Sequence, residues 1–295
     1  MKLENKTIDF SSSMHNILVS AHDIGAANII FSFIEKYSHH NYFFNLEGPA
    51  KKIYLKKNYK NYSLDNIPDS FDILISGTGW QSDHEHLARR YFYKKNLHVV
   101  AVIDHWVNYS ERFIKEKEKI FANEIWVTDK IALAKAREEL SFKNLKLIKN
   151  YYLDRIVKKI KSNVSYETDS ILYLSEPIRS QLGKEFDYLN FFLKSIDSLK
   201  IGDRKIFFRL HPTEHEEKYK DYLSNSPKDI QIDKEQNVED SIISSKYIFG
   251  IQSMALYTAA LAGKTTYTVL MQDDDELVLP SKKIIELRKG INSNL

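Results

Sequence analysis

The sequence contains no cysteine, and this absence removes several kinds of chemistry at once. Without thiols the chain can form no disulfide, no thiolate zinc site and no cysteine nucleophile. An excess of one charge is lacking too, because 43 Lys and Arg residues stand against 40 Asp and Glu residues, which leaves a net charge of +3. This near balance does not indicate a general nucleic-acid binder.

Long hydrophobic runs are absent as well. No apolar stretch approaches the roughly 20 residues that a helix needs to cross a bilayer, and residues 1–13 lack the apolar core of a signal peptide. With 43% hydrophobic and 28% charged residues, the composition is that of a soluble globular protein. The sequence therefore predicts a cytoplasmic protein, and 295 residues suffice for two domains of ordinary size.

Strand-like and helix-like segments alternate along both halves, which predicts the α/β class with parallel sheets covered on both faces. In the first half we expect strands at residues 16–20, 42–45, 71–76, 98–103, 124–128 and 145–148. In the second half we expect strands at residues 170–174, 206–210, 229–232, 247–250 and 265–271, and a basic helix at 281–289 as the last element. The polar stretch 158–169 has no apolar periodicity and predicts a domain boundary, with domains of 1–160 and 161–295.

The second half is organised around a strand that ends at a histidine. Residues 206–210 form a short apolar run of strand-forming residues, with Arg209 near its end. Pro212 cannot donate to a sheet and disfavours helix for His211, so the strand is expected to stop there. Ligands of open α/β sheets bind at the carboxyl ends of strands, which makes His211 a candidate phosphate contact. The alternative is a histidine that only hydrogen-bonds the backbone.

A second strand end points to the same kind of ligand. Residues 247–250 read as a buried strand, and residues 251–263 read as a small-residue helix closed by Gly263. Ser253 lies where an N-cap would lie, and a helix N-terminus is a ready phosphate site. Gln252 and Ser253 are therefore candidate substrate ligands. The alternative for Ser253 is a purely structural cap.

Acidic side chains follow two strands of the first half. Asp23 lies between the first strand and a helix, beside Gly25, the only glycine where the dinucleotide fingerprint needs three. It is a candidate general base, and the alternative is an Asx-type cap of the helix. Asp104 and His105 follow the fourth strand and are reserve candidates for the base or for an acceptor contact. The run His84-Glu85-His86 is no zinc motif, because histidines two apart on a helix point to different faces.

Together these signals resemble bacterial glycosyltransferases that use CMP-activated acidic sugars, such as sialyl-, polysialyl- and capsule Kdo transferases. The resemblance is carried by His211-Pro212 after a strand, by the Ser175-Glu176-Pro177 turn and by Gln252-Ser253. In the first half, Asp23-Ile24-Gly25 resembles the acidic-residue-plus-glycine motif of several such families, without its second acidic residue. A related resemblance is to teichoic-acid glycerophosphotransferases, which use a CDP-linked donor and also carry a strand-ending His-Pro.

The resemblance implies the GT-B architecture, in which two Rossmann-like domains face a central cleft, the first binding the acceptor and the second the nucleotide-sugar. It also implies an inverting transfer that uses no metal and no cofactor. His211 and the helix start at Ser253 would stabilise the charge on the leaving phosphate. Asp23 would take the acceptor proton, and Glu176 would accept from ribose hydroxyls or the cytosine amine. The other expected substrate contacts are Ser175, Arg209, Pro212 and Gln252.

Two basic stretches suggest a setting for the enzyme. They comprise Lys51, Lys52, Lys56, Lys57 and Lys60, interleaved with tyrosines, and Lys282, Lys283, Arg288 and Lys289 on the expected last helix. Basic surfaces attract anionic membranes, at roughly 1 kcal/mol per basic residue. The expected partners are thus a nucleotide-sugar donor, a glycan or lipid-linked glycan acceptor and the inner face of an anionic membrane, in surface polysaccharide synthesis. A solvated charged face is the alternative to the membrane contact.

Other functions stay open on the same fold. One is a teichoic-acid-type glycerophosphotransferase or a UDP-sugar epimerase, and for the epimerase we expect more acidic side chains and a UDP site. Another is a non-catalytic nucleotide-sugar binding protein, which would bind a nucleotide but release it with no acceptor.

Overall fold

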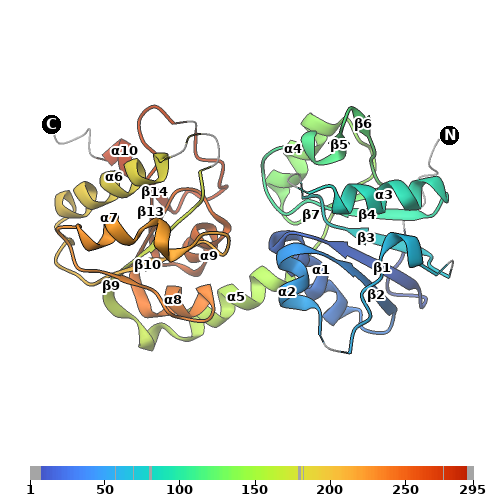
Figure 1. The fold of residues 1–295 in the computed structure, drawn as a ribbon, viewed down its shortest axis with the longest axis horizontal. Helices are drawn as coiled ribbons and strands as arrows, with labels where there is room; N and C mark the ends of the chain where they lie inside the picture. The colour runs from blue at the N-terminus through green and yellow to red at the C-terminus, as the bar shows by residue number, and fades with distance from the viewer. Residues whose placement is uncertain are drawn as a thin grey trace. The chain divides into compact units, whose positions relative to one another are not determined.

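Two parallel β-sheets, each of six strands in the part of the chain that the structure describes, form the framework of the protein (Figure 1). The structure is a computed structural model and describes residues 8–56, 58–68, 70–79, 82–178, 181, 183–274 and 276–290. The chain divides into two units, Met1–Leu153 and Asp154–Leu295, with one sheet in each. The predicted boundary after residue 160 lies a few residues beyond this division, inside helix α5, Tyr151–Ser162.

The sheet of the N-terminal unit has the strand order β2-β1-β3-β4-β7-β8, and every neighbouring pair is parallel. Its strands are β1 Asn16–Ala21, β2 Asn41–Leu46, β3 Ile73–Ser76, β4 His98–Val102, β7 Glu124–Val127 and β8 Leu145–Leu147. Its helices are α1 Ile24–Lys36, α2 Gly48–Tyr54, α3 His84–Lys94 and α4 Lys130–Leu140. The short elements are the hairpin of β5 Ile114–Lys115 and β6 Glu118–Lys119, and the 3₁₀ turns η1 Leu64–Asn66 and η2 Glu111–Phe113.

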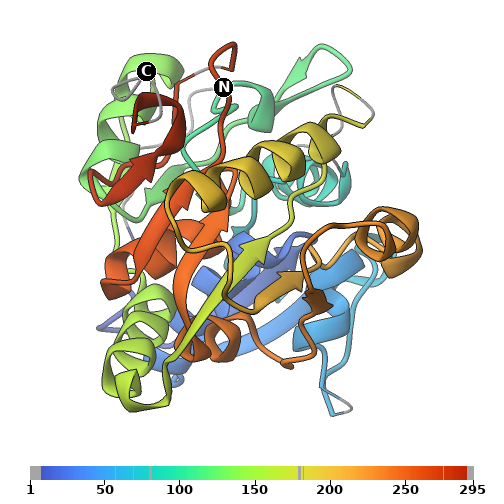
Figure 2. The same ribbon diagram turned by 90° about the vertical axis from the view of Figure 1, so that its left-hand side faces the viewer.

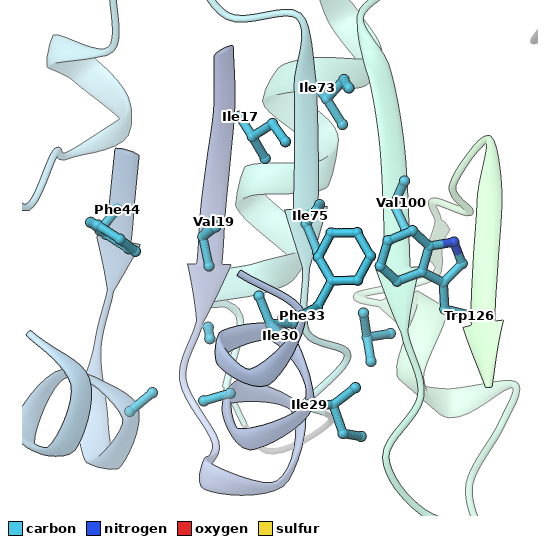
Figure 3. Packing of buried hydrophobic residues seen from close by; sticks show 14 of the residues in the cluster. Ile17, Val19, Ile29, Ile30, Phe33, Phe44, Ile73, Ile75, Val100 and Trp126 are labelled. Atoms are coloured by element: carbon cyan, nitrogen blue, oxygen red, sulfur yellow. The ribbon is translucent and has the colours of Figure 1, made fainter. Parts of the chain in front are cut away.

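The inner strands β3 and β7 of this sheet are buried along their whole length, which is why they lie in apolar runs of the sequence. Figure 3 shows α1 in front of the strands, with Ile29, Ile30 and Phe33 turned toward them, and α3 behind. The rings of Phe33 and Trp126 pack with centroids 4.8 Å apart. Helix α1 follows β1 in the chain, and α3 follows β3. The N-terminus of each helix therefore lies at the carboxyl edge of the sheet.

The sheet of the C-terminal unit has the order β11-β10-β9-β12-β13-β14, again parallel throughout. Helix α6 crosses one face of it (Figure 2), and its Leu189 and Phe192 pack on Tyr173 and Phe208 of the strands. The strands are β9 Thr168–Leu174, β10 Ile206–Arg209, β11 Ile230–Ile232, β12 Ser245–Gly250, β13 Thr265–Thr268 and β14 Ile284–Glu286. The helices are α6 Lys184–Ser198, α7 Lys220–Ser224, α8 Val238–Ser244, α9 Met254–Ala262 and α10 Leu287–Gly290, with 3₁₀ turns η3 Val164–Tyr166 and η4 Glu216–Lys218. The predicted α/β class with two Rossmann-like units is confirmed.

The last part of the chain differs from the prediction. Residues 284–286 form β14, which pairs with β13 from Thr266–Ile284 to Thr268–Glu286, so the predicted basic helix at 281–289 is wrong. Only the short α10 follows. The strand expected at 265–271 ends at Thr268 and is not the last one. The polar stretch from 158 is partly helical, because α5 continues to Ser162.

The basic stretches are also less uniform than expected. Lys51 and Lys52 are exposed on α2, Lys56 lies over the Tyr59 ring at 5.7 Å, and Lys57 lies outside the described residues. Arg288 is mostly buried and donates to the carbonyl oxygens of Met271 and Asp274. No helix in the described ranges is long and apolar enough to cross a bilayer.

Candidate functional site

Three loops of the C-terminal unit meet at the carboxyl edge of its sheet. Strand β9 lies between β10 and β12, and Leu174 is in register with Arg209 on one side and Gly250 on the other. The residues that follow these three strands therefore leave the sheet side by side, about 4.8 Å apart from one strand to the next. They are Ser175-Glu176, Leu210-His211 and Ile251-Gln252-Ser253. The structure thus brings together the C-terminal candidates that the sequence singled out.

Ser175 ties the histidine loop to the central strand. Its buried hydroxyl accepts from the His211 backbone N–H at 2.8 Å and donates to Glu214 Oε2 at 2.7 Å. A serine hydroxyl has one proton, so Ser175 has none to offer a phosphate while the Glu214 bond is intact. Its contacts are those of a positioning group, and its expected role in substrate binding remains a prediction.

Glu214 is the acid at the centre of this tie. Burial raises the pKa of its carboxyl, but donors from Lys218, Ser175 and Tyr219 outweigh burial and lower the net pKa. The Lys218 ammonium and the Tyr219 hydroxyl both bond Oε1, at 2.6 and 2.7 Å. The carboxylate is thus held ionised and holds the Ser175 hydroxyl in turn.

The contacts of His211 set the orientation of its ring. The Thr213 backbone N–H donates to Nδ1 at 3.3 Å, and the Thr213 hydroxyl lies 2.8 Å from the same nitrogen. A backbone N–H can only donate, so Nδ1 is the acceptor and the neutral ring carries its proton on Nε2. Nε2–H is the donor that an anion would use. Pro212 is exposed beside it, and its expected contact with a substrate remains a prediction.

Glu176 ties the other side of the central strand. Its Oε2 accepts from the Gln252 backbone N–H at 3.0 Å. Burial raises the pKa of this carboxyl, and Glu214 adds to the rise while the Gln252 bond opposes it. The side-chain Oε1 of Gln252 lies 3.5 Å from the Val278 N–H. Glu176 therefore bridges two loops, and its expected contact with a nucleoside stays a prediction.

Ser253 is the N-cap of α9, as the sequence predicts. Its Oγ accepts from the Leu256 N–H at 3.3 Å, and Gly263 ends the helix with φ of 91°. The hydroxyl proton of Ser253 and the N–H groups of Met254 and Ala255 remain at the helix start, where an intrahelical acceptor is missing. A helix start of this kind is favourable for an anion.

The guanidinium of Arg209 bonds neighbouring segments of the protein. It donates to Asp233 at 2.6 Å, to Ser241 at 2.7 Å and to the Glu235 carbonyl at 3.0 Å. These bonds join β10 to the segments before and inside α8. The observed contacts are therefore those of a scaffold residue and add nothing to its expected role in substrate binding.

The N-terminal unit has its own edge of polar side chains, after β1, β3 and β4. Asp23 occupies the N-cap position of α1, but its carboxylate makes no capping hydrogen bond. It lies 2.7 Å from His22 Nδ1 instead, and its side chain is about one-third exposed. The alternative of an Asx-type cap is therefore wrong, and the carboxylate is open to a proton-transfer role.

Asp104 and His105 differ from Asp23 in how they are held. Asp104 Oδ1 accepts from Arg112 at 2.8 Å, and its Oδ2 lies 2.0 Å from where a Cβ on Gly25 would be. Burial lowers the pKa of His105, against the opposing effect of Asp104, and its buried Nδ1 has no partner among the described residues. The ion pair with Arg112 makes Asp104 a weaker candidate for the base than Asp23.

Glu85 is the residue at this edge that sequence reasoning missed. It is fully buried on the first turn of α3, and its Oε1 accepts from the His22 backbone N–H at 2.9 Å. Burial raises the pKa of this carboxyl to about 7. The only local signal was its place shortly after the Gly77-Thr78-Gly79 turn. No set of three or more His, Asp and Glu side chains within the described ranges is arranged to hold a metal ion.

Comparison with known proteins identifies the fold. No protein-family model matches the sequence, and no curated protein matches it. The UDP-GlcNAc 2-epimerase of Methanocaldococcus jannaschii, in complex with UDP-GlcNAc and UDP, is 14% identical, with a TM-score of 0.62 over 94% of this chain and 91% of that one. The UDP-GlcNAc 2-epimerase from Neisseria meningitidis, bound to UDP-GlcNAc, is 12% identical, with a TM-score of 0.66 over 95% of this chain and 90% of that one. These likenesses confirm the GT-B fold of the chain, and at such low identity they show the fold alone.

Proposed function

We propose that this chain is an inverting glycosyltransferase that needs no metal and moves an acidic sugar, a sialic-acid-like nonulosonate or Kdo, from a CMP-sugar to a glycan acceptor. The observation that carries the proposal is the C-terminal edge. There the loop of His211 and the start of α9 at Ser253 lie on either side of the Ser175-Glu176 turn, and hydrogen bonds tie both to it. An imidazole N–H and a helix start both favour a bound phosphate.

The proposed reaction leaves one extra negative charge on a single phosphate. The acceptor oxygen bonds to the anomeric carbon while the bond from that carbon to the phosphate oxygen breaks, and CMP departs with the electron pair. His211 Nε2–H and the N–H groups of Met254 and Ala255 stabilise the departing phosphate. Asp23 takes the proton of the acceptor hydroxyl. Attack opposite the leaving group inverts the anomeric carbon.

The charge of the N-terminal edge supports this division of roles. Asp23, Glu85 and Asp104 bring three carboxyl groups to the start of α1 and its neighbouring loops. Acidic side chains there disfavour a bound phosphate and suit a site that accepts a proton. We expect the acceptor to be a glycan or lipid-linked glycan of a surface polysaccharide, in the cytoplasm or at the inner face of the membrane.

One observation favours a second candidate, a UDP-sugar epimerase. Glu85 adds a further acid to the edge that already holds Asp23 and Asp104, and an epimerase is expected to need more acidic groups than a transferase. The two solved structures described above have the same fold and are bound to UDP or UDP-GlcNAc. A teichoic-acid-type transferase with a CDP-linked donor would use the C-terminal edge in the same way.

Nucleotide binding and turnover separate these candidates. A thermal-shift panel of CMP, CDP, UDP and GDP at equal concentration should show the largest rise in Tm with CMP, because a ligand of the native state stabilises it more the more tightly it binds. CMP should then be released from a CMP-sugar only when an acceptor is present, and equally in EDTA. A larger shift with UDP, with a UDP-sugar isomerised and no nucleotide released, would establish the epimerase instead. Binding without turnover of any donor would indicate a non-catalytic binding protein.

A further inference from the structure

Two carboxyl groups of the N-terminal edge approach the same glycine. A Cβ on Gly79 would lie 2.5 Å from Asp23 Oδ2 and 2.9 Å from Glu85 Oε2. The distance between these two oxygens therefore cannot exceed the sum of the two values. A Cβ on Gly77 would lie 2.5 Å from Glu85 Oε1. The turn therefore needs glycine at both positions, because a methyl group at either would occupy the space of a carboxylate oxygen.

The two carboxyl groups have unequal surroundings. Asp23 is about one-third exposed and lies against His22 Nδ1. Glu85 has no exposed surface, and its Oε2 is buried with no hydrogen-bond partner among the described residues. Arg89, one turn further along α3, donates to the carbonyl oxygens of Gly77 and Arg112 at 2.8 and 2.9 Å. Among the described residues, the Oε2 atom of the buried acid thus lacks a donor of the kind that keeps a carboxylate ionised.

Three titratable groups face Glu85: Asp23 and His22 from the turn after β1, and Arg89 from its own helix. Burial raises the pKa of Glu85 to about 7, and the negative charge of Asp23 adds to the rise. The His22 N–H bond, Arg89 and the His22 ring act in the opposite direction. Near neutral pH a large share of the molecules therefore keep a proton on Glu85.

We propose that Asp23 and Glu85 form a carboxyl pair that holds one proton between them near neutral pH. Glu85 bears the proton and is a positioning residue, because its Oε1 holds the backbone of the turn that carries Asp23. Asp23, the more exposed member, receives the proton of the acceptor hydroxyl. The inference rests on the proposed function only in taking Asp23 as the base.

A direct titration tests the pair without any substrate. In full-length protein labelled with ¹³C at the glutamate carboxyl carbons, the resonance that disappears in Glu85→Gln should titrate near pH 7. Asp23→Asn should lower its midpoint, because one facing negative charge is gone. Glu138→Gln, at an exposed glutamate of α4, is the matched control and should leave the midpoint unchanged. A Glu85 resonance that titrates in the ordinary range of glutamate, or that Asp23→Asn does not move, overturns the pair.

The pH profile of turnover tests the positioning role. The wild-type rate should bend near pH 7, and Glu85→Gln, which keeps the acceptor for the His22 N–H but cannot ionise, should lose this bend. Glu85→Ala should lower the rate at every pH at least tenfold, and the glutamine variant should restore most of it. A glutamine variant whose profile bends as the wild type does contradicts the proposal. If no variant turns over any donor while the titration is as expected, the proposed function fails and the carboxyl pair stands.

Discussion

The two sheet edges use acidic side chains in opposite ways. At the C-terminal edge the acids act as ties: Glu214 holds the hydroxyl of Ser175, and Glu176 holds the backbone of the α9 start. At the N-terminal edge Asp23 makes no capping bond, and Glu85 is buried with one oxygen unpartnered among the described residues. The first arrangement is a set of acids that already have hydrogen-bond donors as partners. The second includes a buried carboxyl group, Glu85, whose pKa burial raises to about 7.

The largest effect is expected from a change of His211 at the C-terminal edge. His211→Ala should lower turnover of the donor by about 10²–10³-fold, because the departing phosphate loses a hydrogen-bond donor. Initial rates of nucleotide release measure this, with a melting curve to show that the variant is folded. His215→Ala, at an exposed histidine close in sequence, is the control and should behave as the wild type. Activity of His211→Ala within a few-fold of the wild type would remove the phosphate from this edge.

A change of Glu85 at the N-terminal edge should give the next largest effect, on the pH dependence of stability. Below pH 4.5 Glu85 is protonated in both the folded and the unfolded chain. Between about pH 4.5 and 7 the unfolded chain releases a proton from Glu85 that the folded chain keeps, so the contribution of Glu85 to the free energy of unfolding falls as pH rises through this window, by about 3 kcal/mol. Glu85→Gln should remove this fall.

Urea unfolding at pH 5, 6 and 7 measures this difference. All three tryptophans belong to the N-terminal unit, so their fluorescence follows the unfolding of that unit alone. Glu138→Gln should keep the wild-type dependence. If Glu85→Gln and Glu138→Gln show the same pH dependence of the free energy of unfolding, the raised pKa of Glu85 is contradicted.

Glycines at the two edges should respond differently to a methyl group. Gly79→Ala should destabilise the N-terminal unit by about 1–3 kcal/mol, because the new Cβ would meet two carboxylate oxygens at 2.5 and 2.9 Å. Gly250→Ala is the matched change at the C-terminal edge, where the nearest atoms would lie 3.4 Å away, an ordinary contact. It should shift stability by at most about 1 kcal/mol. Equal effects in thermal melts would show that the N-terminal acids are not tightly packed.

The smallest effect is expected from the hydroxyl that ties the histidine loop. Ser175→Ala should destabilise the C-terminal unit by about 1–2 kcal/mol, since the His211 N–H loses its partner. Ser198→Ala, which removes an exposed bond to the Lys194 carbonyl, should change the stability by less than about 0.5 kcal/mol. Far-UV circular dichroism during urea unfolding measures both. A Ser175→Ala protein as stable as the control variant would show that the hydroxyl does not hold the loop.

Local signals in the sequence predicted where chain segments end. Pro212 marks the end of the histidine strand, and Ser253 and Gly263 mark the two ends of α9 as expected. Strand β14 was not predictable in this way. Its residues, Ile284–Glu286, are flanked by the basic residues Lys283 and Arg288, and this pattern favours a charged helix. The strand conformation depends on pairing with β13, which no local signal indicates.

The candidate site shows the same limit. The sequence predicted that Ser175, His211 and Ser253 lie at strand ends, but their hydrogen-bond partners depend on which strands become neighbours. Ser175 lies 36 residues from the backbone N–H that it holds. Glu85 was missed because its burial comes from His22, 63 residues away, and from glycines that let two turns approach closely.

The strand orders also determine when each half of the protein can fold during synthesis. Every strand of the first sheet has been made once Leu147 leaves the ribosome, so this half can fold while the rest is still being translated. In the second sheet the central strand β9 is made first, and its neighbour β12 only arrives after three more helices and two more strands. Until β12 is made, the backbone N–H and C=O groups on one edge of β9 have no strand to pair with. A chaperone that binds unpaired strand edges would therefore be expected to bind β9.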